Sequence, residues 1–367
     1  MATFDPNNPG RALSPGAALP PAAGGLPPSP EFLLADVTEA TSEVGDELPP
    51  GAGPYELAWR RLKRNRVALA FGGLFILIVV MCLLAPLYSQ YVAHIGPDTQ
   101  NITGTVKVGG KVENIVSLIG IPIGPTWELG HYFLGADATG RDVSVRLLYG
   151  GRNSLEIGAV ATLITTLLAM ICGLLAGYFR GLTDGIISRT LDIIWAYPVL
   201  LLGITLSTVL EVRGLGPFHG TTLLSTALVV GFVYVPYVAK PIRAQVLALR
   251  DREFVDAARQ QGLGPLRIMA GEILPNVAST IVVFVPLILA NAILSEAALT
   301  YLGAGVQPPS PSWGTMISDG ISTIPASFSN VLVPGIMLVL AVLSVNVFGD
   351  GLRDALDPRA KIRLGKE

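Results

Sequence analysis

Six long apolar runs constrain the fold of this chain more than any other feature. Each has about the 18 to 20 residues that a helix needs to cross a hydrocarbon core roughly 30 Å thick. The runs are continuous rather than alternating at every second residue, which favours helices over the strands of a membrane barrel. The predicted spans are Val67–Tyr88, Leu155–Phe179, Leu191–Leu210, Thr222–Ala239, Val277–Leu302 and Val331–Phe348. The predicted fold class is an all-α polytopic membrane protein with six transmembrane helices.

Composition supports this fold class. The 367 residues are 51% hydrophobic and only 14% charged, whereas soluble domains average about 25% charged residues. So many apolar runs cannot all be buried in the core of one soluble domain of this size. A multi-pass protein of the cell membrane, in contact with lipid, is therefore expected.

The distribution of positive charge predicts the orientation of the spans. With the N-terminus placed in the cytoplasm, 19 of the 25 lysines and arginines fall on the cytoplasmic side. The stretch WRRLKRNR directly precedes the first span, where cations anchor a helix end most strongly. Both termini are therefore predicted to be cytoplasmic.

The chain divides into segments of different composition. Residues 1–54 hold seven acidic residues, eleven prolines and one arginine, which predicts a disordered cytoplasmic segment. No basic stretch followed by a short apolar one occurs there, so the first span is expected to be an uncleaved anchor. The predicted segments that follow are 55–88 with the first span, 89–151 outside the membrane, 152–350 as a core of five transmembrane helices with the cytoplasmic connection 240–275, and the cytoplasmic tail 351–367.

Two outer segments have patterns of their own. Residues 89–151 contain glycine, proline and threonine and are expected to be partly strand and partly turn. At the end of this segment, Asp142 and Arg146 are four residues apart, and apolar residues lie toward another face. This spacing predicts an amphipathic helix at the membrane interface before the second span. Trp313 is expected at interface depth, within an outer re-entrant or surface segment.

Enzyme chemistry is not indicated by the sequence. His94, His131 and His219 lie in outer connections and form no H-E-x-x-H pair, and no G-x-S-x-G turn occurs. A G-x-x-x-x-G-K-[ST] phosphate loop is also missing, so the chain is not expected to bind or hydrolyse ATP, and no metal site is expected. Cys82 and Cys172 lie in different spans and are expected to be packing residues.

Polar residues inside the spans are few. Asp192, Asn291, Glu296 and Asn346 are candidates for the transport pathway or for gating, because burying a polar group in a membrane is costly. The other interpretations are structural: an ion pair between Asp192 and Arg189, a cap for Glu296, and helix-joining amides for the two asparagines. Pro198 and Pro236 are expected to bend the third and fourth spans.

The connection Lys240–Pro275 is far longer than a helical hairpin needs. From Asp251 to Gln261 the residues suit a helix, and Gly262 is a suitable left-handed stop. Pro265 suits the first turn of a second helix.

Both predicted helices of this connection have an apolar side. The first is expected to carry Phe254, Ala257, Ala258 and Gln261 close to one face, and the second to carry Leu266, Met269 and Ile273 along one side. Small alanines allow another surface to approach the backbone closely. Two interpretations remain open: a plug for a groove in another protein, or an amphipathic helix resting on the inner leaflet.

The ordered residues of this connection resemble a known family. Asp256-Ala257-Ala258, Gly262, Ile268 and Leu274-Pro275 resemble the EAA loop of permeases in binding-protein-dependent ABC importers. The stretches LGADATGRDVSVRLLYGGRNSL, SEAALTYLGAGVQPPSPSWGTMISDG and FGDGLRDALDPR resemble the C-type permease of dipeptide, oligopeptide and nickel importers. The resemblance extends from about Tyr55 to Arg359. Asp256 stands where the family usually has glutamate, and Glu272 where it usually has histidine.

The resemblance implies a type I ABC importer permease. The connection would then form a coupling helix that an ATP-binding subunit receives, through Phe254, Asp256, Ala257, Ala258, Gly262, Leu263 and Gly264. The other implied partners are a homologous second permease and an extracytoplasmic substrate-binding protein, with ATP and magnesium on the ATP-binding subunits and no nucleic acid.

The implied function is transport of dipeptides or oligopeptides. Permeases for nickel or another small solute are alternatives within the family. An ion-coupled secondary transporter is an alternative from another class, but it requires charges deep in the membrane, and the deep positions here are nearly free of charge.

Overall fold

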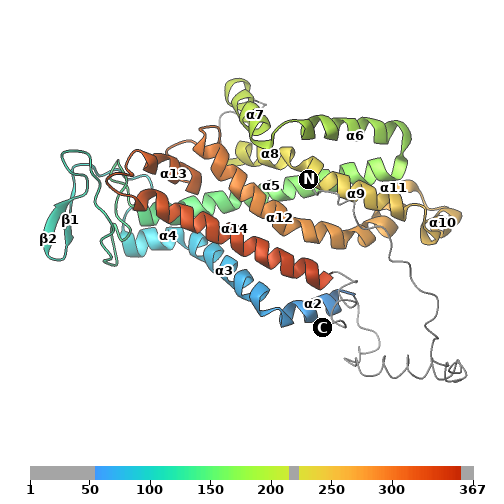
Figure 1. Cartoon of the computed structure of the whole chain (residues 1–367), viewed down its shortest axis with the longest axis horizontal. Helices are drawn as coiled ribbons and strands as arrows, with labels where there is room; N and C mark the ends of the chain where they lie inside the picture. Colours follow the sequence, from blue (N-terminus) through green and yellow to red (C-terminus); the bar gives the residue numbers. More distant parts are fainter. Residues whose placement is uncertain (1–53, 215–222, 357–367) are drawn as a thin grey trace, which may run out of the picture. The chain divides into compact units, whose positions relative to one another are not determined.

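The computed structural model describes residues 54–214 and 223–356. By length and composition, four helices in this part can cross a membrane: α3 (Arg66–Leu83), α5 (Val143–Phe179), the continuous segment Pro265–Tyr301 and α14 (Ser329–Leu356). Two bent helix pairs meet the same criteria together, so the described residues contain up to six spans, as predicted (Figure 1). Most of the predicted disordered segment 1–54 and of the tail 351–367 lies outside the described residues.

Helix α5 is central to the packing. It contacts α8 (Leu223–Val233), α9 (Val235–Leu249) and α12 (Leu274–Tyr301) along its length. A Cβ atom added at Gly173 would lie 2.5 Å from Ile242, and one at Gly177 would lie 2.6 Å from Val246. Only glycine therefore allows α5 and α9 to pack this closely, as at many helix contacts in membranes.

The predicted third span, Leu191–Leu210, is wrong as a single helix. Helix α6 (Gly181–Ala196) and helix α7 (Val199–Arg213) meet at an angle of 97°. Tyr197 between them has φ −91° and ψ 140°, because the ring of Pro198 disfavours a helical conformation in the preceding residue. The bend predicted at Pro198 is confirmed, and it is sharper than a kink.

The predicted fourth span is also a bent pair. Helices α8 and α9 meet at 42°, and Pro236 lies in the first turn of α9, where its missing N–H leaves no helical bond unmade. Helix α9 continues ten residues beyond the predicted end at Ala239. The bend predicted at Pro236 is confirmed.

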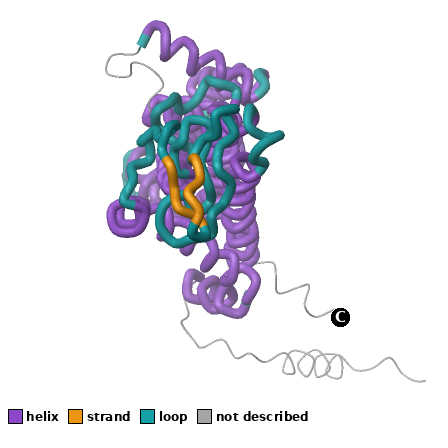
Figure 2. Tube along the Cα trace, turned by 90° about the vertical axis from the view of Figure 1, so that its left-hand side faces the viewer, coloured by secondary structure: helices purple, strands orange, loops and turns teal. Residues whose placement is uncertain are grey.

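The segment between α3 and α5, which the charge distribution predicts to be outside, is mostly loop. It begins with α4 (Ala85–Tyr88) and the π-helix η1 (Ser89–Ala93). Strands β1 (Thr105–Val108) and β2 (Lys111–Asn114) then form an antiparallel hairpin, drawn in orange in Figure 2. Gly109 and Gly110 at its tip have φ of +56° and +81°, which suits a two-residue hairpin turn. The expected mixture of strand and turn is confirmed.

The predicted interfacial helix before the second span is not a separate helix. Helix α5 begins at Val143 and continues without a break, and Asp142 caps it by accepting hydrogen bonds from Ser144 N at 2.8 Å and Val145 N at 3.2 Å. Residues 143–147 are buried in protein. The amphipathic spacing is real, but the polar side faces other protein segments instead of water.

Trp313 is likewise enclosed by protein and does not lie on a surface segment. It is fully buried at the start of α13 (Trp313–Ile321), and its Nε1–H donates to the carbonyl of Leu147 at 3.2 Å. Ser312 and Thr315 form a capping box that fixes the start of this helix. Helix α13 packs on α5, α12 and α14, so the tryptophan is a core residue of the outer end.

The remaining helix, α2 (Pro54–Arg64), lies beside the end of α14. Ala58 and Leu62 of α2 form a small apolar cluster with Ala68 of α3 and Ala355 of α14. The chain before the first span is thus joined to its last helix.

Candidate coupling surface

The connection between α9 and α12 forms two short helices, as predicted. Helix α10 (Glu253–Gln260) is terminated by Gly262, two residues after its last helical residue, and the φ of Gly262 is +78°. Gly262 N–H donates to the carbonyl of Arg259 at 2.9 Å, and Leu263 N–H donates to the carbonyl of Ala258 at 3.1 Å. These two bonds define a Schellman motif, which requires a left-handed residue at this position.

The second helix begins at Pro265 and does not end where the connection ends. Helix α11 (Pro265–Ile268) continues through the π-helix η2 (Met269–Ile273) into α12. Together they form one helical segment of 37 residues, Pro265–Tyr301. Helix α11 is therefore continuous with a candidate membrane span.

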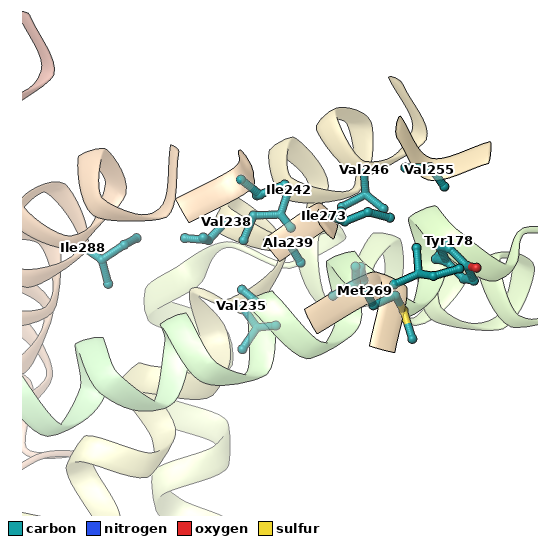
Figure 3. Close-up of a cluster of buried hydrophobic side chains, with 14 of the residues drawn as sticks. Tyr178, Val235, Val238, Ala239, Ile242, Val246, Val255, Met269, Ile273 and Ile288 are labelled. Atoms are coloured by element: carbon teal, nitrogen blue, oxygen red, sulfur yellow. The ribbon is translucent and has the colours of Figure 1, made fainter. Parts of the chain in front are cut away.

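The inner face of the connection is anchored in an apolar cluster. Val255 and Ala258 of α10 are buried, as are Ile268, Met269 and Ile273 of the second helical segment. They pack in one cluster with residues of α5 and α9 that include Tyr178, Val246 and Ile242 (Figure 3). The predicted faces are wrong in part, because Ala258 points inward while Leu266 is 74% exposed.

The solvent-exposed face of the connection carries several of the predicted coupling residues. Phe254, Asp256 and Ala257 are exposed on α10, and Gly262 and Gly264 are exposed after it. Leu263 is half-buried against the apolar cluster, as the hydrophobic contact of a Schellman motif requires. The connection thus has one side that packs on the protein and one side that is exposed. We call the exposed side, with Phe254, Asp256, Ala257, Gly262 and Gly264, the coupling surface.

Charged side chains tie α10 to the end of α5. Arg180 Nη2 lies 2.6 Å from Asp251 Oδ2, and the guanidinium of Arg259 lies 5.8 Å from the ring centroid of Tyr178. Partial desolvation raises the pKa of Asp251, but hydrogen bonds and charge interactions with Arg180 and Arg250 lower it by more. The pKa of Asp251 therefore lies below its ordinary value. Asp251 and Arg259 fall within the segment predicted as a helix, but their contacts with Arg180 and Tyr178 were not predicted.

The four candidate pathway residues do not form one site. Asp192 is 58% exposed and pairs with Lys240 Nζ at 2.8 Å, so the predicted pair with Arg189 is wrong. Asn291 donates to the carbonyl of Leu287 in its own helix at 2.8 Å and does not join helices by this bond. Asn346 is the member of this set that lines a cavity, together with residues of α9 and α12.

Glu296 is fully buried near the outer end of α12. Its Oε1 accepts from Thr300 Oγ1 at 2.9 Å, while its Oε2 has no hydrogen-bond partner. Trp313 N–H, which starts α13, donates to Ser154 Oγ of α5 at 3.2 Å. Glu296 lies on the last turns of α12. The bond between Trp313 and Ser154 joins α13 and α5, which both pack on α12.

The described residues contain no group of three His, Cys, Asp or Glu side chains able to hold a metal ion. Cys82 is buried among the apolar residues of α3, α5 and α13, and Cys172 is half-buried beside α9. Both cysteines serve as packing residues. The coupling surface, by its exposed apolar and acidic groups, is suited to binding another protein.

Comparison with known proteins identifies the family. The profile of the binding-protein-dependent transport system inner membrane component matches residues 169–362, and that of the N-terminal transmembrane domain of oligopeptide transport permease C matches residues 53–103. The di/tripeptide transport system permease protein DppC of Pseudomonas aeruginosa is 35% identical over 311 residues, covering 84% of this chain and 93% of that protein.

Two further relatives match over similar lengths. The dipeptide permease DppC of Haemophilus influenzae is 35% identical, covering 84% of this chain and 96% of that protein. The glutathione transport permease GsiD of Pectobacterium atrosepticum is 32% identical, covering 84% and 92%. Among solved structures, an inward-facing MetNI methionine ABC transporter aligns with a TM-score of 0.48 and 17% identity, covering 57% of this chain and 96% of that chain.

The similarity to permeases runs through nearly the whole described chain and includes the segment that forms the coupling surface. The chain therefore belongs to the family of binding-protein-dependent transport system inner membrane components and is a permease subunit of an ABC importer.

Proposed function

We propose that this permease forms the translocation path for dipeptides or oligopeptides and couples it to ATP hydrolysis in separate subunits. The names of the relatives support peptides as the cargo, and glutathione, carried by one of them, is itself a tripeptide. Nickel or another small solute is the alternative cargo. The observation that carries the coupling role is the coupling surface, which is anchored on one side and free on the other.

The proposed complex contains this chain, a homologous second permease, ATP-binding subunits with ATP and magnesium, and an extracytoplasmic substrate-binding protein. The chain lies in the cell membrane with both termini in the cytoplasm, consistent with the excess of cations at that side. A groove of the ATP-binding subunit would receive Phe254, Asp256 and Ala257, which are exposed on α10.

ATP binding draws the ATP-binding subunits together and moves the docked α10. Because α10 packs on α5 and α9, and α11 is continuous with α12, the displacement passes to three spans as a rigid-body movement. ATP can bias the permease only to the extent that docking is stronger in one of its two conformations.

The test of cargo uses the complete complex in proteoliposomes, with the substrate-binding protein outside. ATP-dependent accumulation of a labelled dipeptide is the expected result. Accumulation of nickel with no peptide would overturn the peptide assignment while leaving the permease role intact.

The test of coupling uses a matched pair of glycines. Gly262→Val forces a β-branched residue to positive φ, at a cost of about 1–3 kcal/mol, although its Cβ has open space. Gly271→Val also has open space but lies in ordinary helical backbone of η2. We expect a severalfold loss of uptake in the first variant and near-normal uptake in the second. Normal uptake by an assembled Gly262→Val complex would contradict the proposed geometry.

A further inference from the structure

A cavity of about 660 Å³ lies between α9, α12 and α14, at the end of these helices that carries the coupling surface. Its walls come from this one chain. Tyr237 and Gln245 are on α9, Thr280 and Phe284 are on α12, and Asn346 is among its residues on α14. The volume falls within the roughly 300–1,000 Å³ typical of small-molecule sites.

The polar side chains of this cavity have unused hydrogen-bonding capacity. Gln245 Oε1 is buried and has no partner. Ser279, Thr280 and Asn346 also line the cavity, and none of their side chains has a hydrogen bond within residues 54–214 and 223–356. Buried polar groups are usually satisfied, so the unpaired Gln245 Oε1, beside three half-buried polar side chains with free hydrogen-bonding capacity, indicates a site for a polar ligand.

The cavity also carries one charge of each sign. Asp350 and Arg353 lie three residues apart on α14, are exposed at the solvent edge, and have no ion-pair partner in the described part of the chain. The floor is apolar, with Phe284 and Leu287 half-buried. The polar and charged groups thus surround a small apolar base.

This combination selects a class of ligand. An anion alone would be repelled by Asp350, and a cation alone by Arg353. A zwitterion satisfies both, because its carboxylate pairs with the guanidinium and its ammonium with the carboxylate. The amides of Gln245 and Asn346 can bond a peptide group between the two charged ends, and the apolar floor can hold a short side chain.

We infer that this cavity binds a short zwitterionic peptide on the coupling side of the permease, as a site occupied by cargo that has crossed the membrane. The inference rests on the proposed peptide transport. The site includes α12, which is continuous with α11, and α9, which packs on α10. Its occupancy is therefore linked to the position of the coupling surface.

The test measures binding of isotope-labelled dialanine to the nucleotide-free complex in nanodiscs, by saturation-transfer NMR. Arg353→Gln and Asp350→Asn are each expected to weaken binding by about twofold to fivefold, since each loses an ion pair that is exposed to solvent. Arg353→Lys keeps the charge and is expected to recover most of the affinity. Asp354→Asn is the matched control, because Asp354 is exposed on the same helix and does not line the cavity.

Three results would overturn the site. One is unchanged binding in Arg353→Gln, and another is equal affinity for N-acetyl-dialanine amide, which has no charges. The third is displacement of dialanine by phosphatidylethanolamine added to the nanodiscs, since that zwitterionic lipid would then be the occupant. Uptake of the labelled dipeptide by the wild-type complex is measured separately. If the complex imports peptides yet gives one of these three results, the proposed binding site is wrong and the proposed function still stands.

Discussion

The two ends of α5 both carry arginine and aspartate pairs, but the pairs differ in burial. At the outer end, the side chains of Arg141 and Arg146 are 9% and 2% exposed, and Asp137 is 11% exposed. At the other end, Arg180 and Asp251 are 48% and 55% exposed. The same kind of ion pair is therefore largely shielded from solvent at one end of α5 and exposed to solvent at the other.

The outer pairs join distant parts of the chain. Arg141 lies 2.6 Å from Asp137 and 2.9 Å from Asp319 of α13, and Arg146 lies 3.6 Å from both Asp98 and Asp319. Buried charges are held only when they are paired, so this cluster fixes the loop, α5 and α13 in one arrangement. The exposed pair at the other end can orient α10 without holding it rigidly. The outer end is thus built for fixed packing, and the coupling end for adjustable docking.

The largest effect is expected at the outer end, from Arg146→Met. This change keeps the volume of the stem but leaves Asp137 and Asp319 with one cation fewer, and breaking a buried pair costs about 3–5 kcal/mol. The measurement is thermal unfolding of the purified complex. Arg152→Met is the control, because Arg152 is on the same helix and exposed. Equal destabilisation by the two variants would contradict the structural role of the buried cluster.

An intermediate effect is expected from an amide placed on the two faces of α10. Ala258→Asn puts a polar amide into the apolar cluster, at a cost of about 1–3 kcal/mol, whereas Ala257 next to it is exposed. Ala257→Asn is expected to leave stability within about 0.5 kcal/mol and to weaken association with the ATP-binding subunit. Unfolding and co-purification are measured for both. Similar stability of the two variants would show that the inward face is assigned wrongly.

The smallest effect is expected from Asp251→Asn, which removes the exposed pair with Arg180. The folded-state pKa of Asp251 is lowered, so its stabilisation is present above the unfolded-state pKa and is lost as the pH falls through the folded-state pKa. At neutral pH we expect a shift of the unfolding temperature near the limit of detection, and none in high salt. A shift as large as that of Arg146→Met would remove the distinction between the two ends.

Local features of the sequence predicted much of this fold. Run length predicted the membrane spans, Gly262 and Pro265 predicted the two-helix connection, and Pro198 and Pro236 predicted the bends. Each of these signals acts within a few residues along the chain. These local signals could not predict the 97° angle at Pro198, because that angle depends on what α6 and α7 pack against.

Features that depend on distant contacts were missed. Asp319 lies 178 residues from Arg141, so no local spacing could connect them. Positions 257 and 258 are both alanine, so residue type does not distinguish them. Only packing against α5 and α9 decides which one points inward. Trp313 shows the same limit, because an aromatic residue near a span end fits both an interface and a core.

The continuity of α11, η2 and α12 has a geometrical consequence. A helix of 37 residues is about 55 Å long, so a tilt of roughly 5° at its coupling end moves its far end by about 5 Å, close to the rise of one helical turn. Helix α12 can thus act as a lever arm, which enlarges a small rotation at the ATP-binding subunit into a step of useful size across the membrane.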